Sequence, residues 1–353
     1  MLTISKQDAL AEPVRVGLIG AGRIGTAHAE TLARRVPGVH LMAIADPRPG
    51  AAETVANPLR ARGVTDPEGI FSDPEIEAVV IAASSTSHTS LIQAAIAAGK
   101  AVFCEKPMAE TLEDADRSIA AAKAAGLPLQ VGFNRRFARA FREAYDVIVA
   151  GGIGTPQLLR SLTRDPGLAN PGAVPPWTIF TQTLIHDFDA LNWLNPGAEP
   201  VEVYATADAL VAPDFKEAGL LDTAVVIVKF DNGAIATAEA NFSAVYGYDV
   251  RAEIFGSAGM VTAGDAALTG MTHYTSAGRG QTTARDDVEL MRDAFAGEFA
   301  SFAQAVRTGK EPDVTACIES YLLEMRFCLW RRVWPAPAQL MPRRSNGAYA
   351  SRV

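Results

Sequence analysis

Two short motifs in the first third of the chain contain the residue types that a hydride-transfer site needs. Gly20, Gly22 and Gly25 have the spacing G-x-G-x-x-G, which is typical of a turn that holds a phosphate group against the start of a helix. Lys106 lies in an E-K-P motif after a short apolar run. An ammonium group at a sheet edge can stabilise an alkoxide or polarise a carbonyl. Together the motifs predict a dinucleotide site with a cation beside the reactive ring.

The three glycines have separate expected roles. Gly20 permits the tight turn, Gly22 lets the backbone approach the phosphates, and Gly25 allows the helix to pack closely on the strand. Arg23 and Ile24 lie inside the motif and are expected to contact the cofactor. Glu105, next to Lys106, is expected there as well. A glycine turn in an unrelated α/β protein is the alternative, which the flanking strand and helix disfavour.

The choice of cofactor depends on Asp46, which ends the second predicted strand at about the spacing expected of a ribose-binding acid. A carboxylate accepts hydrogen bonds from ribose hydroxyls and repels a 2′-phosphate, so NAD is favoured over NADP. Arg48 would accommodate NADP if its guanidinium faced the ribose, and is otherwise a solvated arginine.

A polar segment follows the third predicted strand, at the carboxyl edge where ligands bind in such sheets. Ser84 and Ser85 could bind cofactor phosphate or ribose, or could cap a helix. His88 could face the cofactor or make a structural hydrogen bond near the helix start.

The elements around these motifs alternate apolar runs with amphipathic stretches. Such a pattern indicates a parallel sheet covered on both faces, a doubly wound Rossmann fold. The expected strands are 14–20, 39–45, 78–82, 101–104 and 129–132, and the expected helices are 25–35, 89–98 and 112–125. Glycines at 99 and 126 are expected to end two of these helices.

After residue 135 the pattern changes to longer strands with period-two character. A helix over 138–150 is followed by expected strands at 157–163, 201–209, 223–230, 234–241 and 250–255, with helices at 183–194 and about 298–308. The Asn232-Gly233 pair predicts a hairpin turn. These features indicate an open, mainly antiparallel sheet. We therefore expect an NAD-binding domain over 1–134 and a substrate-binding and oligomerisation domain over 135–353, with a loose tail from about 335.

Composition restricts the classes of partner. The chain has 353 residues, 48% of them hydrophobic, and a net charge of −8, which disfavours nucleic acid and anionic membranes as partners. Cys104, Cys317 and Cys328 form no metal-ligand pattern, and no motif suggests a metal site. We expect free thiols, no signal peptide and no membrane span, hence a cytoplasmic protein.

The chain resembles the family of glucose–fructose oxidoreductase, inositol dehydrogenase and related sugar dehydrogenases (Gfo/Idh/MocA). The resemblance rests on the glycine motif, the segment 99–107, the segment 132–137 and the segment 185–189. Residues 245–249, with 255–257, look most like the inositol 2-dehydrogenase branch. The family resemblance implies a Rossmann domain joined to an open-sheet domain. It also implies homodimers or homotetramers formed by packing of the sheets.

The resemblance also implies two catalytic residues. His186 takes the proton of a substrate hydroxyl while hydride leaves the same carbon, and Lys106 stabilises that oxygen. A helix histidine satisfied in the core is the alternative for His186. One departure stands at Gln182, where the family usually has an aspartate four residues before the histidine. A neutral amide can hydrogen-bond there, but it cannot stabilise the charged imidazole as a carboxylate would.

Several polar and aromatic residues are expected to bind substrate, because a hydroxyl-rich ligand needs convergent polar groups and flat walls. They are Asn134, Arg135, Thr163, Asp165, Trp177, Tyr246 and Tyr248, together with Lys106, Gln182 and His186. Asp165 could instead begin a turn before Pro166. Core packing is the expected role of Trp193.

The sequence thus predicts an NAD-dependent oxidoreductase that oxidises a secondary alcohol of a cyclic polyol or sugar. Two alternatives stay open: a redox-neutral, NAD-dependent glycoside-cleaving enzyme of the same fold, and a non-catalytic NAD-binding sensor. The polyol, the reacting carbon and the direction are not specified by these residues.

Overall fold

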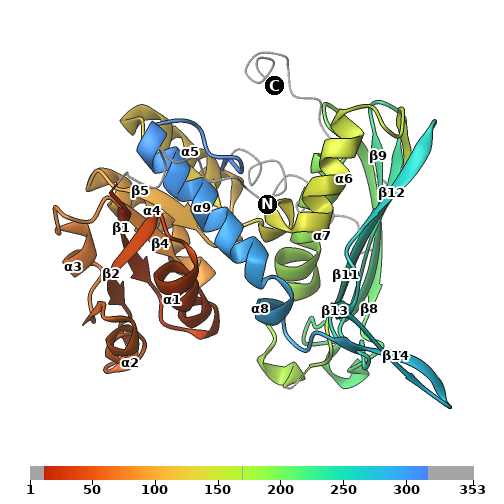
Figure 1. Ribbon diagram of the computed structural model, residues 1–353, viewed down its shortest axis with the longest axis horizontal. Helices are drawn as coiled ribbons and strands as arrows, with labels where there is room; N and C mark the ends of the chain where they lie inside the picture. The colour runs from red at the N-terminus through yellow and green to blue at the C-terminus, as the bar shows by residue number, and fades with distance from the viewer. Residues whose placement is uncertain (1–11, 169, 317–353) are drawn as a thin grey trace. The chain divides into compact units, whose positions relative to one another are not determined.

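The computed structural model describes residues 12–168 and 170–316, which divide into two compact units (Figure 1). Unit 1 contains residues 12–143, 245–248 and 264–316, and unit 2 contains residues 144–244 and 249–263. The predicted single boundary near residue 134 differs from this division, because two later segments group with the first unit. The expected loose tail, Cys317 and Cys328 lie outside the described residues.

Unit 1 is built on a six-stranded parallel sheet with strand order β3-β2-β1-β4-β5-β6. This order is that of a dinucleotide-binding Rossmann sheet. Its strands are β1 (Val14–Ile19), β2 (Val39–Ala45), β3 (Arg62–Val64), β4 (Ala78–Ile81), β5 (Ala101–Cys104) and β6 (Leu129–Val131). The prediction missed only the short β3, whose residues lack an apolar run.

The helices of unit 1 come from both its early and its late segments. They are α1 (Arg23–Arg35), α2 (Ala51–Ala56), α3 (Glu68–Phe71), α4 (Ser85–Ala97), α5 (Leu112–Ala125), α8 (Asp287–Leu290) and α9 (Arg292–Thr308); α6 (Arg139–Val149) begins in unit 1 and ends in unit 2. Helix α9, drawn in blue, lies beside α1 although more than 250 residues separate them (Figure 1). Phe299 and Phe302 of α9 join the buried cluster of Leu18, Leu32 and Phe103, so residues late in the chain complete the Rossmann core.

Unit 2 contains a second six-stranded sheet with order β12-β11-β7-β10-β9-β8 (Figure 1). Its strands are β7 (Pro156–Arg164), β8 (Pro200–Asp208), β9 (Thr223–Phe230), β10 (Ile235–Asn241), β11 (Asp249–Gly256) and β12 (Gly259–Ala263). All pairs are antiparallel except β7 with β10, which confirms a mainly antiparallel sheet. Gly233 has a φ of 88° in the β9–β10 connection, as the predicted hairpin turn requires.

One face of this sheet is covered by helix α7 (Leu184–Trp193), which packs on β7 and β10. A π-helical turn over Ile179–Thr183 precedes α7, where the sequence predicted that a regular helix begins at residue 183. Trp193 stacks on Tyr145 at 4.4 Å between ring centroids, in agreement with its expected packing role. A separate two-stranded ribbon in unit 1, β13 (Ala267–Thr275) with β14 (Gly278–Thr283), was not predicted.

Candidate active site

The glycine loop connects β1 to α1, and each glycine occupies the kind of position expected. Gly20 has a φ of 108°, and a Cβ there would collide with the backbone oxygen of Ala82 on the neighbouring strand connection. A Cβ at Gly25 would collide with the backbone oxygen of Gly20, so the helix can approach the strand only without one. At Gly22, the corresponding position has no described residue within 4 Å other than Gly22 itself and its chain neighbours. The loop is therefore closely packed against the protein at Gly20 and Gly25 and open at Gly22, which fits a pyrophosphate group held at the start of α1.

Asp46 follows β2 and is fixed by hydrogen bonds to both sides of its carboxylate. The backbone N–H of Ala21 donates to Oδ2 at 2.8 Å, and the backbone N–H of Arg48 donates to Oδ1 at 3.0 Å. The Arg48 guanidinium adds two further bonds, from Nε to Oδ1 at 2.8 Å and from an Nη to Oδ2 at 3.0 Å. The side-chain hydrogen bond from Arg48, with the two backbone donors, outweighs burial and lowers the pKa of Asp46 to about 2.

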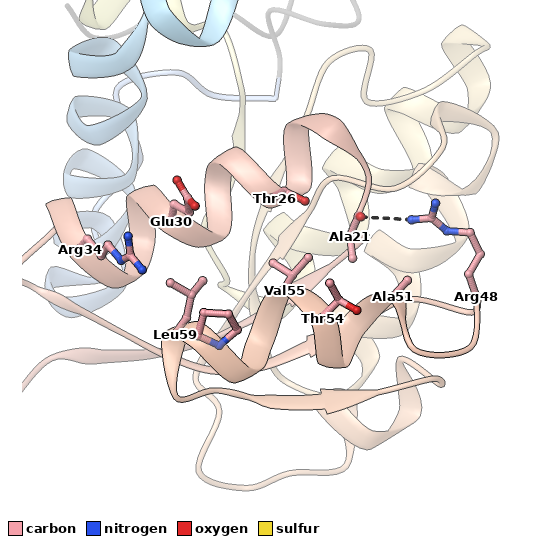
Figure 2. A pocket seen from close by; sticks show the side chains of 10 residues that line it. Ala21, Thr26, Glu30, Arg34, Arg48, Ala51, Thr54, Val55 and Leu59 are labelled. Atoms are coloured by element: carbon pink, nitrogen blue, oxygen red, sulfur yellow. Dashed lines mark hydrogen bonds between the residues drawn. The ribbon is translucent and has the colours of Figure 1, made fainter.

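Asp46 is thus ionised and aligned with the glycine loop, but its two oxygens are occupied by Arg48 in this structure. Arg48 also donates to the backbone oxygen of Ala21 at 3.1 Å (Figure 2). The guanidinium is mostly exposed. Binding of a ribose at Asp46 would therefore need this exposed side chain to move.

A cavity of about 410 Å³ lies between α1 and α2 and begins at this ion pair (Figure 2). One end is lined by Ala21 and Arg48, and the other by Arg34 and Leu59. Thr26, Glu30, Ala51, Thr54, Val55 and Pro58 complete its lining. The cavity leaves open space beside the carboxylate that is predicted to bind the ribose.

The remaining predicted cofactor residues have mixed surroundings. Arg23 makes a two-bond ion pair with Asp287 of α8, at 2.6 and 3.1 Å, so its side chain has a protein partner. Ile24 packs partly buried against the Rossmann core. Ser84 is the N-cap residue of α4, and its hydroxyl lies 3.0 Å from that of Thr86, while Ser85 is the first residue of the helix. His88 is buried, and both ring nitrogens face backbone oxygens, of Pro107 at 2.8 Å and Ala83 at 3.0 Å. These contacts fit the structural alternative for His88.

Glu105 and Lys106 follow β5 directly, at the carboxyl edge of the parallel sheet. Glu105 is buried and lies 2.6 Å from Nε2 of His28 on α1. Burial raises the pKa of Glu105, but the hydrogen bond from His28 and the charges of His28, Lys106 and His88 prevail and lower it. Its other carboxylate oxygen accepts from the backbone N–H of Lys106 at 3.2 Å, which fixes the peptide that carries the lysine. Lys106 itself is half-buried.

In unit 2, His186 and Gln182 are half-buried on α7 and on the π-helical turn before it. Because Gln182 belongs to this π-helical turn, it and His186 are not related by the four-residue spacing of a regular helix. Neighbouring Asp187 is fully buried, and it accepts hydrogen bonds from the hydroxyls of Ser161 at 2.6 Å and Thr163 at 2.7 Å on β7. These bonds anchor α7, and with it His186, to the sheet.

The structure places the other predicted substrate residues as follows. Thr163 is buried with its hydroxyl on Asp187, so this hydroxyl has a structural partner. Asp165 lies half-buried just after β7, and its backbone pairs with Asn241 and Ala244. Trp177 has a φ of 65° beside the π-helical turn. In unit 1, Asn134 and buried Arg135 begin a 3₁₀ turn that contacts α9, and Tyr246 is exposed while Tyr248 is half-buried.

Sequence reasoning missed three side chains that contact the predicted site segments. His28 and Glu298 lie next to Glu105, and Ser161 donates to Asp187. The available signal for His28 was its position on the buried face of α1, three residues after Gly25. The available signal for Ser161 was that it lies two residues before Thr163, on the same face of β7.

Comparison with known proteins bears on this geometry. Residues 14–133 match the model described as the NAD-binding Rossmann fold of an oxidoreductase family, and residues 141–262 match the GFO/IDH/MocA C-terminal domain. The chain belongs to the Gfo/Idh/MocA family of oxidoreductases. This confirms the predicted family and the two-part fold.

Relatives of this Gfo/Idh/MocA protein include a myo-inositol 2-dehydrogenase of Thermotoga maritima, 37% identical over 86% of this chain and 91% of the relative. A scyllo-inositol 2-dehydrogenase (NAD⁺) of Bacillus subtilis is 35% identical over 86% of this chain and 89% of that protein. The crystal structure of scyllo-inositol dehydrogenase from Lactobacillus casei with NAD(H) and scyllo-inositol is also similar. Its TM-score is 0.86 at 26% identity, over 91% of this chain and 96% of that one.

None of the helices within residues 12–168 and 170–316 has the length and apolar character needed to cross a bilayer.

Proposed function

We propose that this protein is an NAD-dependent dehydrogenase that oxidises a secondary alcohol of a cyclic polyol or sugar to a ketone. The observation that carries the proposal is the placement of three features at one edge of the unit 1 sheet. The glycine loop follows β1, Asp46 follows β2 and Lys106 follows β5. Because these strands are parallel, their carboxyl ends meet at the edge where dinucleotides bind.

The finer choice of cofactor is NAD rather than NADP. The open position above Gly22 and the tight packing at Gly20 and Gly25 fit a pyrophosphate, and the ionised carboxylate of Asp46 fits a free ribose diol. A 2′-phosphate would place its negative charge next to that carboxylate. Arg48 could offset this charge only by leaving Asp46, to which it now donates twice.

In the proposed reaction, bound NAD supplies the acceptor for the hydride of the carbinol carbon. His186 accepts the proton of the same hydroxyl group, and the Lys106 ammonium stabilises the oxygen as negative charge develops on it. Glu105 fixes the peptide of Lys106 through the bond to its N–H, and Asp187 ties the helix of His186 to β7. Asn134, Arg135, Asp165, Trp177, Gln182, Tyr246 and Tyr248 are the proposed contacts to substrate.

The proposed substrate class is a cyclic polyol such as an inositol. Two relatives that are 37% and 35% identical to this chain over the aligned residues are named for myo- and scyllo-inositol. The experiment is a panel of inositol isomers and pyranose sugars assayed with NAD, with NADH absorbance as the readout. We expect turnover of at least one cyclic polyol, and a loss of roughly 10²–10⁴-fold in kcat for Lys106→Met and for His186→Asn.

The same panel distinguishes the two alternatives. A redox-neutral glycoside-cleaving enzyme would release sugar from a glycoside without net NADH. A sensor would bind NAD but leave every polyol unchanged. Either result would contradict the proposed dehydrogenase.

We also propose that the protein assembles with copies of itself through the uncovered face of the unit 2 sheet. Ile235, Leu158, Phe255 and Met260 are register neighbours on β10, β7, β11 and β12. Their exposed fractions lie between 44% and 57%, and they form an apolar row across four strands. Monomeric proteins rarely expose such contiguous apolar surface. A second copy would cover it as a homodimer or within a homotetramer.

A cytoplasmic location is likewise proposed. The three cysteines of the sequence are predicted to be free thiols, which suits a reducing compartment.

A further inference from the structure

Three ionisable side chains meet in the core of unit 1, next to the proposed cofactor edge. They are His28 on α1, Glu105 after β5 and Glu298 on α9, and each is buried. One nitrogen or oxygen atom of each lies within 4.8 Å of the others. Three segments that are distant in sequence thus place two carboxyl groups and an imidazole in one apolar region.

Two members of the cluster form a direct pair. Nε2 of His28 and Oε1 of Glu105 are 2.6 Å apart. The imidazole is enclosed by the edges and faces of Phe295 and Phe299, at 5.1 and 4.9 Å between ring centroids. The lowered pKa of Glu105, which follows from this pair, makes Glu105 the ionised carboxylate of the cluster.

The carboxyl group of Glu298 differs from that of Glu105 in its hydrogen bonding. Neither of its carboxyl oxygens has a hydrogen-bond partner among the residues that the structure describes. Burial, and to a lesser extent the negative charge of Glu105, raises the pKa of Glu298 well above its ordinary value. An ionised and unpaired carboxylate in such a place is strongly unfavourable, whereas a neutral carboxylic acid is much less so.

We propose that Glu298 stays protonated in the folded protein and acts as a positioning residue. As a neutral group it allows Glu105 to stay ionised on His28, and Glu105 in turn holds the backbone of Lys106. The proposal rests on the catalytic role proposed for Lys106. In this proposal Glu298 on α9 is neutral and Glu105 is negatively charged. The position of Lys106 then depends on α9 through Glu298 and on α1 through His28.

The titratable groups that face the cluster support this assignment. His28 on α1, His88 on α4 and Lys106 after β5 act on Glu105, and each favours its ionised form. The Gln130 amide on β6 donates at 3.0 Å to the backbone oxygen of Glu298 and not to its carboxyl group. A bound cation explains the cluster less well, because Nε2 of His28 and Oε1 of Glu105 already form a hydrogen bond with each other.

The charge state is tested with the pH dependence of unfolding of the full chain. Unfolded Glu298 loses its proton above a pH of about 4.3, whereas the folded protein keeps it. Unfolding of the wild type therefore releases a proton and becomes easier as the pH rises, but unfolding of Glu298→Gln does not. We expect the ratio of the two unfolding constants, wild type to variant, to rise about tenfold per pH unit from pH 5 until folded Glu298 ionises.

The matched control is Asp293→Asn on the same helix, because the Asp293 side chain is almost fully exposed. Its ratio should change little over this range. An infrared carboxylic-acid C=O band at neutral pH that disappears in Glu298→Gln would support the proposal without any unfolding. A pH-independent ratio for Glu298→Gln, a missing band, or a stoichiometric metal ion in the purified protein would overturn it.

The positioning role is tested by changing Glu105, with an exposed carboxylate as the control. Asp293→Asn should leave kcat for polyol oxidation within about threefold of the wild type, because its side chain is almost fully exposed. Glu105→Gln should lower kcat at least tenfold with a smaller change in KM for NAD. Equal effects, or the reverse order, would overturn the assignment. If no polyol is turned over, the proposed function fails, whereas the unfolding and infrared results still decide the charge state of Glu298.

Discussion

At the scale of single residues, Asp46 is the carboxylate that we propose selects the cofactor. Its oxygens accept four hydrogen bonds, two from backbone N–H groups that are part of the glycine loop and β2 connection. The sequence predicted both Asp46 and the ambiguity of Arg48. It did not predict that the two side chains pair with each other, because that contact depends on the rotamer of a long exposed side chain.

Replacing Asp46 by asparagine should weaken NAD and relax the choice of cofactor. Loss of charged hydrogen bonds to the ribose should raise KM for NAD about 10–100-fold. KM for NADP should fall relative to KM for NAD, since the repulsion of a 2′-phosphate is removed and Arg48 is released. Steady-state kinetics with both cofactors would measure the ratio, with Asp146→Asn on the surface of α6 as the control. An unchanged ratio would exclude Asp46 from ribose recognition.

The lowered pKa of Asp46 also has a consequence for stability. A carboxyl group with a depressed folded-state pKa stabilises the protein above its unfolded pKa. That contribution should be lost as the pH falls from about 4 through about 2. Asp46→Asn should therefore differ most from the wild type near neutral pH and converge with it in strong acid, as acid unfolding curves would reveal.

Gln182→Asp should shift the pH–rate profile without abolishing NAD binding. A carboxylate near the imidazole would favour its charged form and raise its basicity, which an amide does not do. The measurement is kcat/KM against pH for the wild type and variant, together with NAD titration. If the two profiles superimpose, Gln182 has no part in proton transfer.

At the scale of elements, the sequence predicted the strands of both six-stranded sheets except β3 and β12. It also predicted each described α-helix of ten or more residues, but not the short α2, α3 and α8. It failed where tertiary contacts decide the backbone. The π-helical turn over Ile179–Thr183 has no sequence signal of its own, and α9 begins six residues before the expected start. Strands β13 and β14 are largely exposed on both sides, so they lack the alternation by which strands are recognised. The buried roles of His28 and Glu298 became visible only when α1 and α9 were brought together.

The glycine loop gives a prediction at this scale, because its glycines face different surroundings. Gly25→Ala would force a Cβ onto the backbone oxygen of Gly20 and should destabilise unit 1 by several kcal/mol. Gly22→Ala should fold normally, since its Cβ meets open space, but should weaken NAD binding because the added methyl occupies the side that pyrophosphate approaches. Thermal unfolding and NAD titration of both variants would separate the two roles. Equal stability losses would contradict this distinction.

At the scale of the whole molecule, the two sheets are specialised in different ways. The unit 1 sheet is buried on both faces, which produced the continuous apolar strands of the sequence. Among the described residues, one face of the unit 2 sheet is exposed, which fits the alternation in the sequence. The alternation contains apolar residues on this exposed side. The prediction of a single boundary did not include the return of segments 245–248 and 264–316 to unit 1. The composition of the sequence does not change where the chain passes back from one unit to the other.

The uncovered face predicts that a charge at its centre disrupts self-association. Phe255→Lys should shift the protein to a smaller species, because the lysine would lie beside Leu158 and Met260 in the apolar row. Leu210→Lys, in an exposed loop of the same unit, is the matched control and should leave the size unchanged. Sedimentation velocity would report both. A monomeric wild type, or equal behaviour of the two variants, would contradict assembly through this face.

The central claim is direct transfer of hydride from a polyol carbon to bound NAD with Lys106 next to the reacting oxygen. The most direct measurement uses a cyclic polyol from the active panel, deuterated at the carbinol carbon, and locates the label in the products. We predict that deuterium appears at C4 of the reduced nicotinamide, with a primary isotope effect that persists in the slow Lys106→Met variant. Label that is lost to water, or remains in a product formed without net NADH, would contradict the account.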